Sequence, residues 1–364
     1  MSVLTYPHPL DYVVGIKYTL TSTRVNKIFK PTPENFYVEE LVDFESIGYN
    51  AEKGEYAVIL VEKHNIETLR ALEVLARALN IPVENLRIMG FKDKAAHTKS
   101  YVFIRRTILD YSKLPLEKRG LRADLVGYVH VKPSIKYHLG NKFTIIISDV
   151  RREDIEVFKD IVKQIEIHGL PSYYGYQRFG YHRCNSHILG KHLLFSREDL
   201  FADELLTKIY LYEDPALVVK RFIRYYRDLR YENAYLRGEF MCTCNSLCKK
   251  YINILRNAYS SYLFNLLLNT IIEKWGWNYL DQGLPTPGCI ETSIPLYSTL
   301  LEIEGLKLSD LRALPCYYRH GLFKPEHGTI RIINGTLHYE FILKRGMYAT
   351  IVLRELFKDN LVLN

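Results

Sequence analysis

Strand-like patterns occupy both ends of this sequence, and helical patterns occupy its middle. Alternating apolar residues predict strands over 36–44, 56–63, 101–104, 124–131, 329–333 and 336–343. Between the two strand-rich ends, residues 185–326 carry mainly helical periodicity. Within this part, the prolines and glycines of residues 278–297 predict a looser region. We therefore expect a discontinuous core of residues 1–184 and 327–364 that carries an inserted, helix-rich domain of residues 185–326.

Length and charge agree with a two-domain protein that binds a polyanion. A chain of 364 residues corresponds to about two domains of ~100–200 residues each. The formal net charge of +8 makes nucleic acid a plausible partner. The 29 tyrosines would suit stacking on RNA bases, although tyrosines buried in a sheet-rich core would give the same count.

The hydropathy pattern and the cysteines predict the cellular compartment and whether the protein binds a metal ion. We expect no signal peptide and no membrane-spanning segment, hence a cytoplasmic protein whose six cysteines are mostly reduced thiols. The Cys242, Cys244 and Cys248 cluster lacks the partner pair that zinc sites require. We therefore expect no metal site.

A loop between two predicted strands, over 86–89 and 101–104, carries the best candidate for chemistry. Gly90 to Tyr101 contains one carboxylate, Asp93, surrounded in sequence by Lys92, Lys94 and Lys99. Nearby cations favour the charged form of an acid, so we expect Asp93 to be ionised and to serve as a nucleophile or base. The alternative is a solvated, lysine-rich hairpin tip.

Two further stretches have compositions that would suit a nucleic-acid surface. Residues 171–180 combine aromatic residues, glycines and the pair Gln177–Arg178, either as an RNA-binding surface or as an aromatic loop packed against a sheet edge. Residues 220–237 carry six basic side chains, which fit a phosphate backbone or a solvated helix face.

Several of these segments, in this order, resemble motifs of the TruD family of tRNA pseudouridine synthases. The similar positions are Lys30 with Pro33-Glu34-Asn35-Phe36, Val38 and Glu40; Gly90, Lys92-Asp93-Lys94, Ala96 and Thr98; Gly140-Asn141-Lys142-Phe143; Ser172 to Gly180; Ala258 to Asn265; and Gly346-Met347-Tyr348-Ala349-Thr350 with Arg354-Glu355. Mild departures occur at Asn35, where the family more often has Asp, at Ser172 in place of Asn, and at Tyr174 in place of Phe.

The resemblance implies an α+β fold: a pseudouridine-synthase core with a mixed, largely antiparallel sheet flanked by helices, plus the inserted TruD-specific domain. It implies an isomerase that detaches a uracil from its ribose at N1, turns it and rejoins it through C5, with Asp93 as the catalytic residue. The substrate would be tRNA, with position 13 the leading target. No cofactor or metal would be needed, and a monomer is expected.

The resemblance also implies supporting roles around Asp93. Phe143 would stack on the target base, with Phe36 and Tyr348 shaping the pocket, and Asn141 would bind the uracil edge or hold the catalytic loop. Lys30 would neutralise a phosphate or pair with Asp93, and Gln177 with Arg178 would order the loop or contact RNA.

The sequence is also compatible with two other functions. A non-catalytic RNA-binding protein or RNA chaperone on the same fold would work without Asp93. A nucleic-acid glycosylase would release free uracil instead of rejoining it to the ribose.

Overall fold

The computed structural model describes residues 4–66, 68–90, 96–118, 120–180, 183–228 and 246–363. The side chains of residues 223–228, 246–251 and 292–294 fall outside this description. Within it, no helix is both long enough and apolar enough to cross a membrane.

A nine-stranded sheet organises the fold, with the order β12-β13-β7-β1-β4-β3-β6-β2 and with β5 paired to β6. Among its described pairs, β1 and β4 run parallel, and the others run antiparallel. The strands are β1 (Phe36–Val42), β2 (Tyr49–Asn50), β3 (Tyr56–His64), β4 (His97–Arg105), β5 (Leu116–Lys118), β6 (Leu121–Val129), β7 (His138–Ile147), β12 (Glu326–Ile333) and β13 (Thr336–Lys344). The predicted α+β class with a mixed, largely antiparallel sheet is confirmed.

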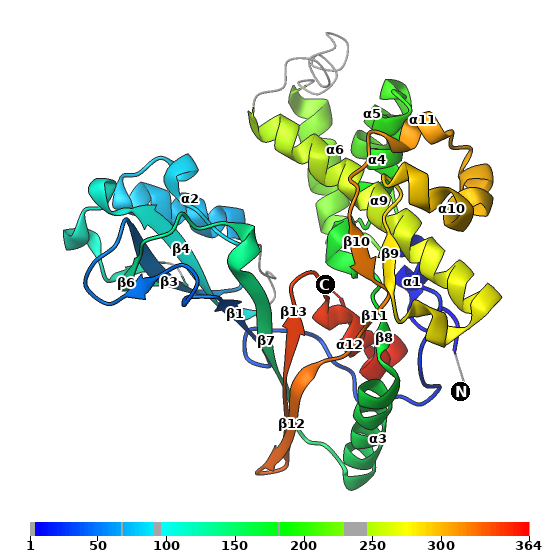
Figure 1. Cartoon of the computed structure of the whole chain (residues 1–364), viewed down its shortest axis with the longest axis horizontal. Helices are drawn as coiled ribbons and strands as arrows, with labels where there is room; N and C mark the ends of the chain where they lie inside the picture. Colours follow the sequence, from blue (N-terminus) through cyan, green and yellow to red (C-terminus); the bar gives the residue numbers. More distant parts are fainter. Residues whose placement is uncertain are drawn as a thin grey trace.

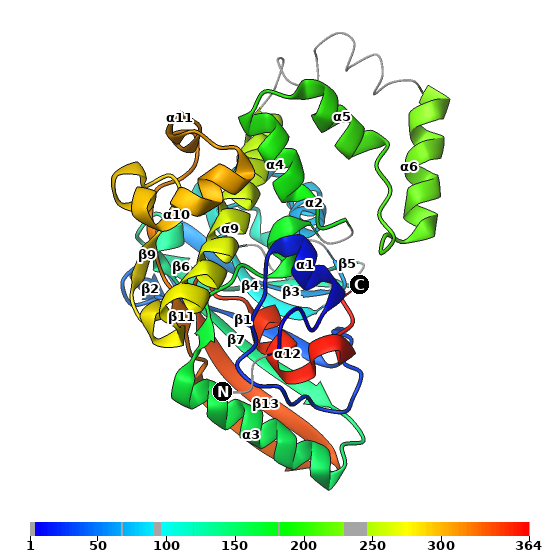
Figure 2. The ribbon, with the colours of Figure 1, turned by 90° about the vertical axis from the view of Figure 1, so that its right-hand side faces the viewer.

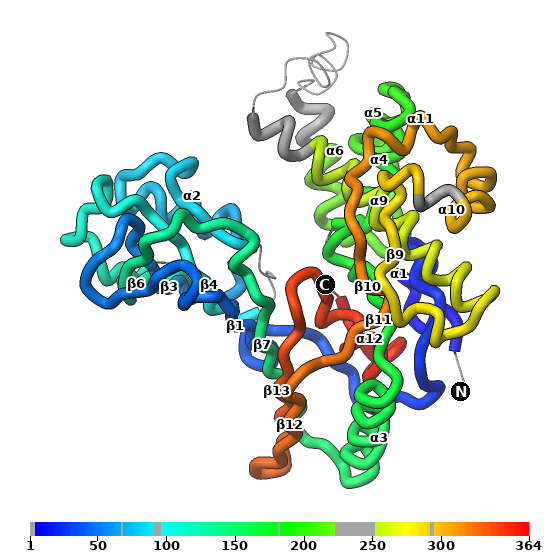
Figure 3. The backbone as a smooth tube through the Cα atoms, viewed as in Figure 1, coloured from blue at the N-terminus to red at the C-terminus, as the bar shows by residue number. Residues whose placement is uncertain are grey.

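Along the chain, most of the helices lie between the strands of residues 36–147 and those of residues 326–344. The helices are α1 (Pro9–Val14), α2 (Thr68–Leu79), α3 (Arg152–His168), α4 (Ser186–Leu194), α5 (Glu198–Leu206), α6 (Pro215–Asp228), α9 (Ser246–Trp275), α10 (Ile290–Glu304), α11 (Leu308–Leu311) and α12 (Ala349–Phe357). Two small sheets, β8 (Leu170–Pro171) with β11 (Leu322–Phe323) and β9 (Gly283–Pro285) with β10 (Tyr318–His320), lie along the same stretch. Figure 3 traces the chain from β7 through α3 and the helical part, then back into the sheet at β12.

Two hydrophobic clusters cover one face of the sheet at its two ends. Helix α2 packs Leu72, Leu75 and Leu79 on residues of β3, β4 and β6. Helices α3 and α12 pack on residues of β1, β7 and β13 in a second, larger cluster. Figures 1 and 2 show α2 above one half of the sheet, α3 and α12 beside the other half, and α4 to α11 gathered to one side. The middle of this face, around β1 and β4, therefore lies between two covered ends.

Two local predictions differ from the structure. Residues 278–297 read as a loose region because of their prolines and glycines, yet α10 begins at Ile290 and contains Pro295. Packing outweighs the cost of the proline, since the fully buried Tyr297 donates a hydrogen bond to the carbonyl of Pro285 at 3.1 Å. The strand predicted over 86–89 is reduced to a single bridge between Arg87 and Phe103.

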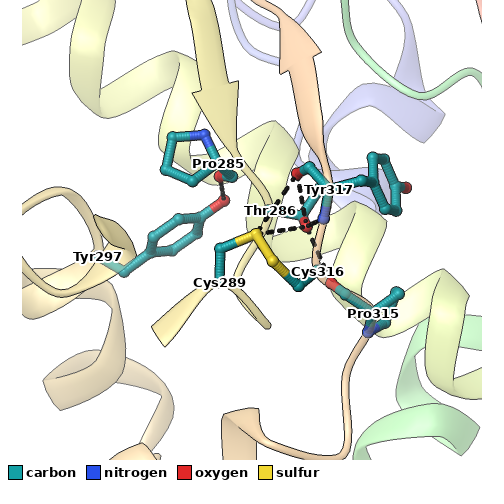
Figure 4. The surroundings of a disulfide bond; sticks show 7 residues. All are labelled: Pro285, Thr286, Cys289, Tyr297, Pro315, Cys316 and Tyr317. Carbon is teal, nitrogen blue, oxygen red and sulfur yellow. Dashed lines mark hydrogen bonds between the residues drawn. A yellow bond between two sulfur atoms is a disulfide. The ribbon is translucent and has the colours of Figure 1, made fainter. Parts of the chain in front are cut away.

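One pair of cysteines is an exception to the expectation of mostly reduced thiols. Cys289 and Cys316 form a disulfide across 27 residues, shown in Figure 4. The neighbouring strands β9 and β10 bring the two ends together, and Thr286 donates its backbone N–H to Tyr317 at 2.9 Å. Spacing along the chain could not reveal this pairing, because it depends on those two short strands.

The remaining cysteines offer little for chemistry or metal binding where they are described. Cys184 is buried, and burial raises the pKa of its thiol to about 12, so it stays protonated. Cys242 and Cys244 lie outside the described residues, as does the side chain of Cys248. Among the described residues, no group of three or more His, Cys, Asp or Glu side chains could hold a metal ion.

Candidate active site

Strand β1 lies at the centre of the candidate site and presents alternate side chains to opposite faces of the sheet. Phe36 and Val38 are buried on the face that the helices cover, whereas Glu39 is exposed on the other face. Val38 lies opposite Phe143 of β7 and opposite Thr98 of β4. Three motifs that are far apart in the sequence therefore meet on the covered face, within neighbouring strands.

Three phenylalanines form a row on this face. Phe143 stacks between Phe36, at 5.9 Å between ring centroids, and Phe341, at 5.4 Å. Only 4% of the Phe143 side chain is exposed. The structure thus brings together Phe36 and Phe143 as predicted, but other rings approach both faces of Phe143. A uracil could stack on it only after one of those rings moves.

Four polar residues lie beside the phenylalanine row on the same face, and we call Lys63, Thr98, Glu40 and Asn141 the polar strip. Lys63 lies opposite Thr98 in the β3–β4 register, and Asn141 lies opposite Glu40 in the β1–β7 register. Lys63, Thr98 and Glu40 are buried, and Asn141 is half-buried. Such a set is unusual on a buried sheet face, because polar groups cost free energy there unless they are paired.

Glu40 lies where the hydrogen-bonded pairing of β1 with β4 ends. The parallel pairing ends at Glu39 and Lys99, and one oxygen of the Glu40 carboxylate accepts the backbone N–H of Tyr101 at 2.9 Å. The other oxygen lies 3.8 Å from Nε2 of the buried His138. Glu40 thus replaces a missing ladder hydrogen bond and places a carboxylate next to Asn141.

Two oxygens of the polar strip have no hydrogen-bond partner within the described part of the chain. They are Oγ1 of Thr98 and Oδ1 of Asn141, both buried. An unpartnered buried oxygen costs roughly 1–3 kcal/mol. These two atoms are candidates for contacts that form only when a ligand is bound.

Asp93 itself lies outside the described residues, and the structure positions the chain on either side of it. Ala96 is fully buried in the same cluster as Phe36 and Phe143. Of the three lysines expected around Asp93, only Lys99 is described. Its side chain lies on the opposite face of the sheet, where Nζ is 3.3 Å from Glu62. Lys99 therefore faces away from the polar strip, because successive strand residues alternate faces.

The other predicted residues lie around the start of α12. Gln177 accepts a hydrogen bond from the Thr350 hydroxyl at 3.0 Å, and Arg178 donates to the Ser261 hydroxyl of α9 at 3.0 Å. Tyr348, at the N-cap of α12, packs edge-on against Tyr174 at 5.9 Å. Gly175 is needed here, since a Cβ would lie 2.4 Å from the Thr350 hydroxyl oxygen. Gln177 thus holds the turn that presents Tyr348.

The aromatic block around residues 173–179 is mostly core, which supports the loop-packing interpretation of its composition. Tyr173, Tyr174, Tyr176 and Phe179 are all buried. Arg319, which the sequence did not single out, lies with its guanidinium 4.3 Å from the Tyr174 ring centroid. Gln177 and Arg178 are the half-buried members of the block.

Part of this block belongs to a second polar cluster, fully satisfied, which we call the buried network. Asp11 accepts hydrogen bonds from Tyr176 at 2.5 Å and from Nε of Arg354 at 2.9 Å. Tyr173 donates to Asn269 at 2.6 Å, and Asn265 accepts the backbone N–H of Tyr174 at 2.8 Å. The motif residues Arg354 and Asn265 therefore join the N-terminal segment, α9 and α12.

The predicted cations differ in what they contact. Lys30 is exposed just before β1. In the basic run of residues 220–237, Arg221 forms an ion pair with the buried Glu213 and donates to the carbonyl of Lys208. The run is therefore partly structural, while the side chains of Arg224 and Arg227 and all of Arg230 and Arg237 lie outside the described residues.

Comparison with known proteins identifies the family. The family model for tRNA pseudouridine synthase D (TruD) matches residues 13–283. This chain belongs to the TruD family. It is an isomerase of the TruD type, with tRNA as the substrate that the family implies.

Similar TruD proteins align over almost the whole chain. A probable tRNA pseudouridine synthase D from Pyrobaculum islandicum is 29% identical over 96% of this chain and 97% of its own. One from Archaeoglobus fulgidus is 29% identical over 97% of this chain and 100% of its own. A crystal structure from Methanosarcina mazei, assigned to tRNA pseudouridine synthase D (TruD), shares the fold with a TM-score of 0.64 at 19% identity, over 95% of this chain and 97% of that one.

Proposed function

We propose that this protein converts uridine to pseudouridine in tRNA, with position 13 as the main target, and that Asp93 is its catalytic residue. The proposal rests on one observation: Phe36 and the pair Asn141 and Phe143, which come from two separate TruD motifs, meet on one face of the sheet, and Ala96, the first described residue after Asp93, is buried in the same cluster as the two phenylalanines. Net charge +8 favours the RNA backbone as a partner.

We also propose that the chain divides as its strands suggest, into residues 1–184 with 327–364 and an insertion of residues 185–326. The nine-stranded sheet takes its strands from residues 36–147 and 326–344, which supports a discontinuous core. The residues of the active site would come from the core, and the insertion would add RNA contacts. A monomer is the proposed state of the free protein.

The reaction requires a carboxylate, a pocket for uracil and contacts that hold the nucleotide after it has turned out of the base stack. Asp93 would act on the ribose or the base while uracil leaves at N1 and returns through C5. Phe143 and Tyr348 would contact the base, and Asn141 its polar edge. Extruding the uridine costs a few kcal/mol, which stacking and phosphate contacts from Lys30 and Arg178 would offset.

The test is nucleoside analysis of tRNA transcripts incubated with the protein. We expect the wild type to form pseudouridine in a transcript with uridine at position 13 and none in a matched transcript with cytidine there. Asp93→Asn should bind tRNA with the same affinity and form no pseudouridine. The matched control is Asp110→Asn, since Asp110 is an exposed carboxylate at the N-cap of the short helical turn Tyr111–Lys113, outside the TruD motifs.

Each alternative gives a different result in the same experiment. If neither wild type nor Asp93→Asn forms pseudouridine although both bind tRNA, the protein is an RNA-binding module or chaperone. If wild type releases free uracil, Asp93 is catalytic in a glycosylase. If pseudouridine appears at another position, the enzyme stands and the position-13 assignment is wrong.

A further inference from the structure

Arg319, in the middle of β10, is a buried arginine whose charge is not matched by a carboxylate. Only 7% of its surface is exposed, whereas Tyr318 and His320 on either side of it are exposed. Unlike Arg354, which pairs with Asp11, Arg319 has no carboxylate within ion-pair distance among the described residues. Arginine is seldom buried without such a partner, because its charge loses hydration. The burial of this guanidinium therefore needs another explanation.

The guanidinium of Arg319 holds two separate segments of the core at once. Its Nε donates to the carbonyl of Ser172 at 2.9 Å, and its Nη1 donates to the carbonyl of Gly346 at 2.8 Å. Its Nη2 lies 3.6 Å from the sulfur of Met347. The planar, rigid fork of an arginine suits such a task, because it fixes the direction of each hydrogen bond as well as its length. Strand β10, which belongs to the proposed insertion, thus reaches the turn that precedes α12.

The turn at Gly346 is shaped around this contact. Gly346 has a φ of +87°, a left-handed conformation that favours glycine, and a Cβ there would lie 3.2 Å from Nη1 of Arg319. The backbone N–H of Met347 closes the turn by donating to the carbonyl of Lys344 at 3.1 Å. Tyr348 follows directly, as the N-cap residue of α12. The direction of Tyr348 therefore depends on where Arg319 holds the carbonyl of Gly346.

Arg319 acts on the same tyrosine a second time, through Tyr174. The guanidinium of Arg319 lies over the Tyr174 ring, which packs edge-on against Tyr348 at 5.9 Å between centroids. The Tyr174 hydroxyl also shares a hydrogen bond of 2.6 Å with Tyr317, two residues before Arg319. Arg319 thus holds both the backbone before Tyr348 and the ring beside it. We propose that Arg319 is a positioning residue, which holds the Gly346–Tyr348 turn so that the Tyr348 ring meets the target base.

This inference rests on the proposed function, because it assumes that Tyr348 contacts the target uracil. A base that is held loosely spends less time in the reactive geometry, and a displacement of about 1 Å can lower a rate 100-fold. Affinity for tRNA comes mainly from contacts to phosphates, and the Arg319 guanidinium is buried against the core. Loss of Arg319 should therefore lower the rate of the chemical step and leave tRNA affinity nearly unchanged.

The experiment measures single-turnover pseudouridine formation in a tRNA transcript at saturating protein, for wild type, Arg319→Met, Tyr348→Leu and the double variant. We expect Arg319→Met to lower the rate per folded molecule roughly 10- to 100-fold. Tyr348→Leu should lower it by at least as much. If Arg319 acts through Tyr348, the double variant should be no slower than Tyr348→Leu alone. Circular dichroism gives the folded fraction of each variant, and tRNA binding is measured separately.

The matched control is Arg183→Met, because Arg183 makes the same kinds of contact as Arg319. Its guanidinium lies 5.5 Å from the Tyr210 ring centroid and donates to three backbone carbonyls between Glu204 and Lys208. These hydrogen bonds join parts of the helical region and do not include the turn before α12. Arg183→Met should therefore lose stability and keep the wild-type rate per folded molecule.

Other results would overturn the proposal. A wild-type rate in folded Arg319→Met would remove Arg319 from the site, and single losses that multiply in the double variant would show that it does not act through Tyr348. Equal losses of rate in Arg319→Met and Arg183→Met would show a general effect of loosening the helical region. Arg319→Lys, which keeps the charge but not the fork, replaces the Met variant if that one unfolds, and failure of both to fold would assign Arg319 to stability alone. A wild type that forms no pseudouridine would instead defeat the proposed function itself.

Discussion

The buried network and the polar strip both place charged side chains inside the protein, but they differ in how completely those side chains are paired. Around Asp11, the carboxylate accepts from Tyr176, Arg354 and the backbone N–H of His8, the last at 3.0 Å. In the polar strip, Thr98 and Asn141 each keep a buried oxygen without a partner in the described part of the chain.

This difference separates two uses of polar residues. A fully satisfied cluster ties elements together, and the network joins the N-terminal segment, the aromatic block, α9 and α12. An incompletely satisfied cluster costs free energy in the free protein and is expected where a ligand completes the contacts. Variants of the network should therefore lose stability, and variants of the strip should lose activity.

The largest loss of stability should follow Arg354→Met. This change leaves the fully buried Asp11 carboxylate without its cation. Breaking a buried ion pair by removing one partner costs about 3–5 kcal/mol, so urea unfolding should show a loss in that range. Activity per folded molecule should be retained.

The matched control is Lys142→Met, which breaks a partly exposed pair with Glu340 at 2.9 Å. Surface pairs contribute less than about 1 kcal/mol, so this variant should unfold nearly like wild type. Equal losses for Arg354→Met and Lys142→Met would mean that the network does not hold these elements together.

A smaller loss should follow removal of the disulfide, which lies on the network side of the molecule. Tyr317, next to Cys316, shares a hydrogen bond of 2.6 Å with Tyr174 of the aromatic block. Closing a loop across 27 residues is worth about 3.5 kcal/mol in the chain-entropy description. The double variant Cys289→Ser with Cys316→Ser should lose about that much in urea unfolding, and reductant should then have no further effect. A wild type insensitive to reductant would contradict the bond's contribution.

A pH-dependent loss of stability is expected from His187, a buried histidine of α4 that packs against the aromatic block. It is buried between Phe179 and Tyr262, with Nδ1 lacking a partner within the described residues, and burial lowers its pKa to about 3. The unfolded chain takes up a proton below pH ~6.5 while the folded protein does not, so stability falls as pH falls from ~6.5 toward 3. Between pH 7.5 and 5.0 this residue should account for about 2 kcal/mol of lost stability.

The comparison variant for that measurement is His187→Phe, which keeps a ring but cannot titrate. The difference between wild type and His187→Phe should widen in favour of the variant as pH falls, measured by urea unfolding at each pH. Parallel curves would show that His187 does not titrate as the geometry requires.

Much of this fold could be predicted from the sequence, because its strands and helices follow clear periods. The alternation of side chains along β3 would have allowed one more prediction. Ala57, Ile59 and Val61 face the covered side of the sheet, and Lys63 is the next residue on that same side. That alternation alone marks Lys63 as a buried lysine. The aromatic block, in contrast, gave no sign of its partners Asp11 and Asn269, because both are distant in sequence and meet it only in the folded chain.

The smallest change in stability, and the sharpest test of the comparison, should come from Thr98→Val. Valine keeps the shape of threonine and its preference for strands, and it removes only the hydroxyl whose buried oxygen has no partner in the described part of the chain. Because this hydroxyl makes no hydrogen bond within the described residues of the folded protein, the substitution removes none there. The free energy of unfolding of Thr98→Val should therefore stay within about 0.5 kcal/mol of the wild-type value or rise above it. If the hydroxyl bonds only in the tRNA complex, the single-turnover rate should fall about tenfold, as expected for one lost hydrogen bond. Wild-type activity in Thr98→Val would show that this oxygen is merely tolerated, and a stability loss as large as that of Arg354→Met would show that the strip, like the network, serves to hold the fold.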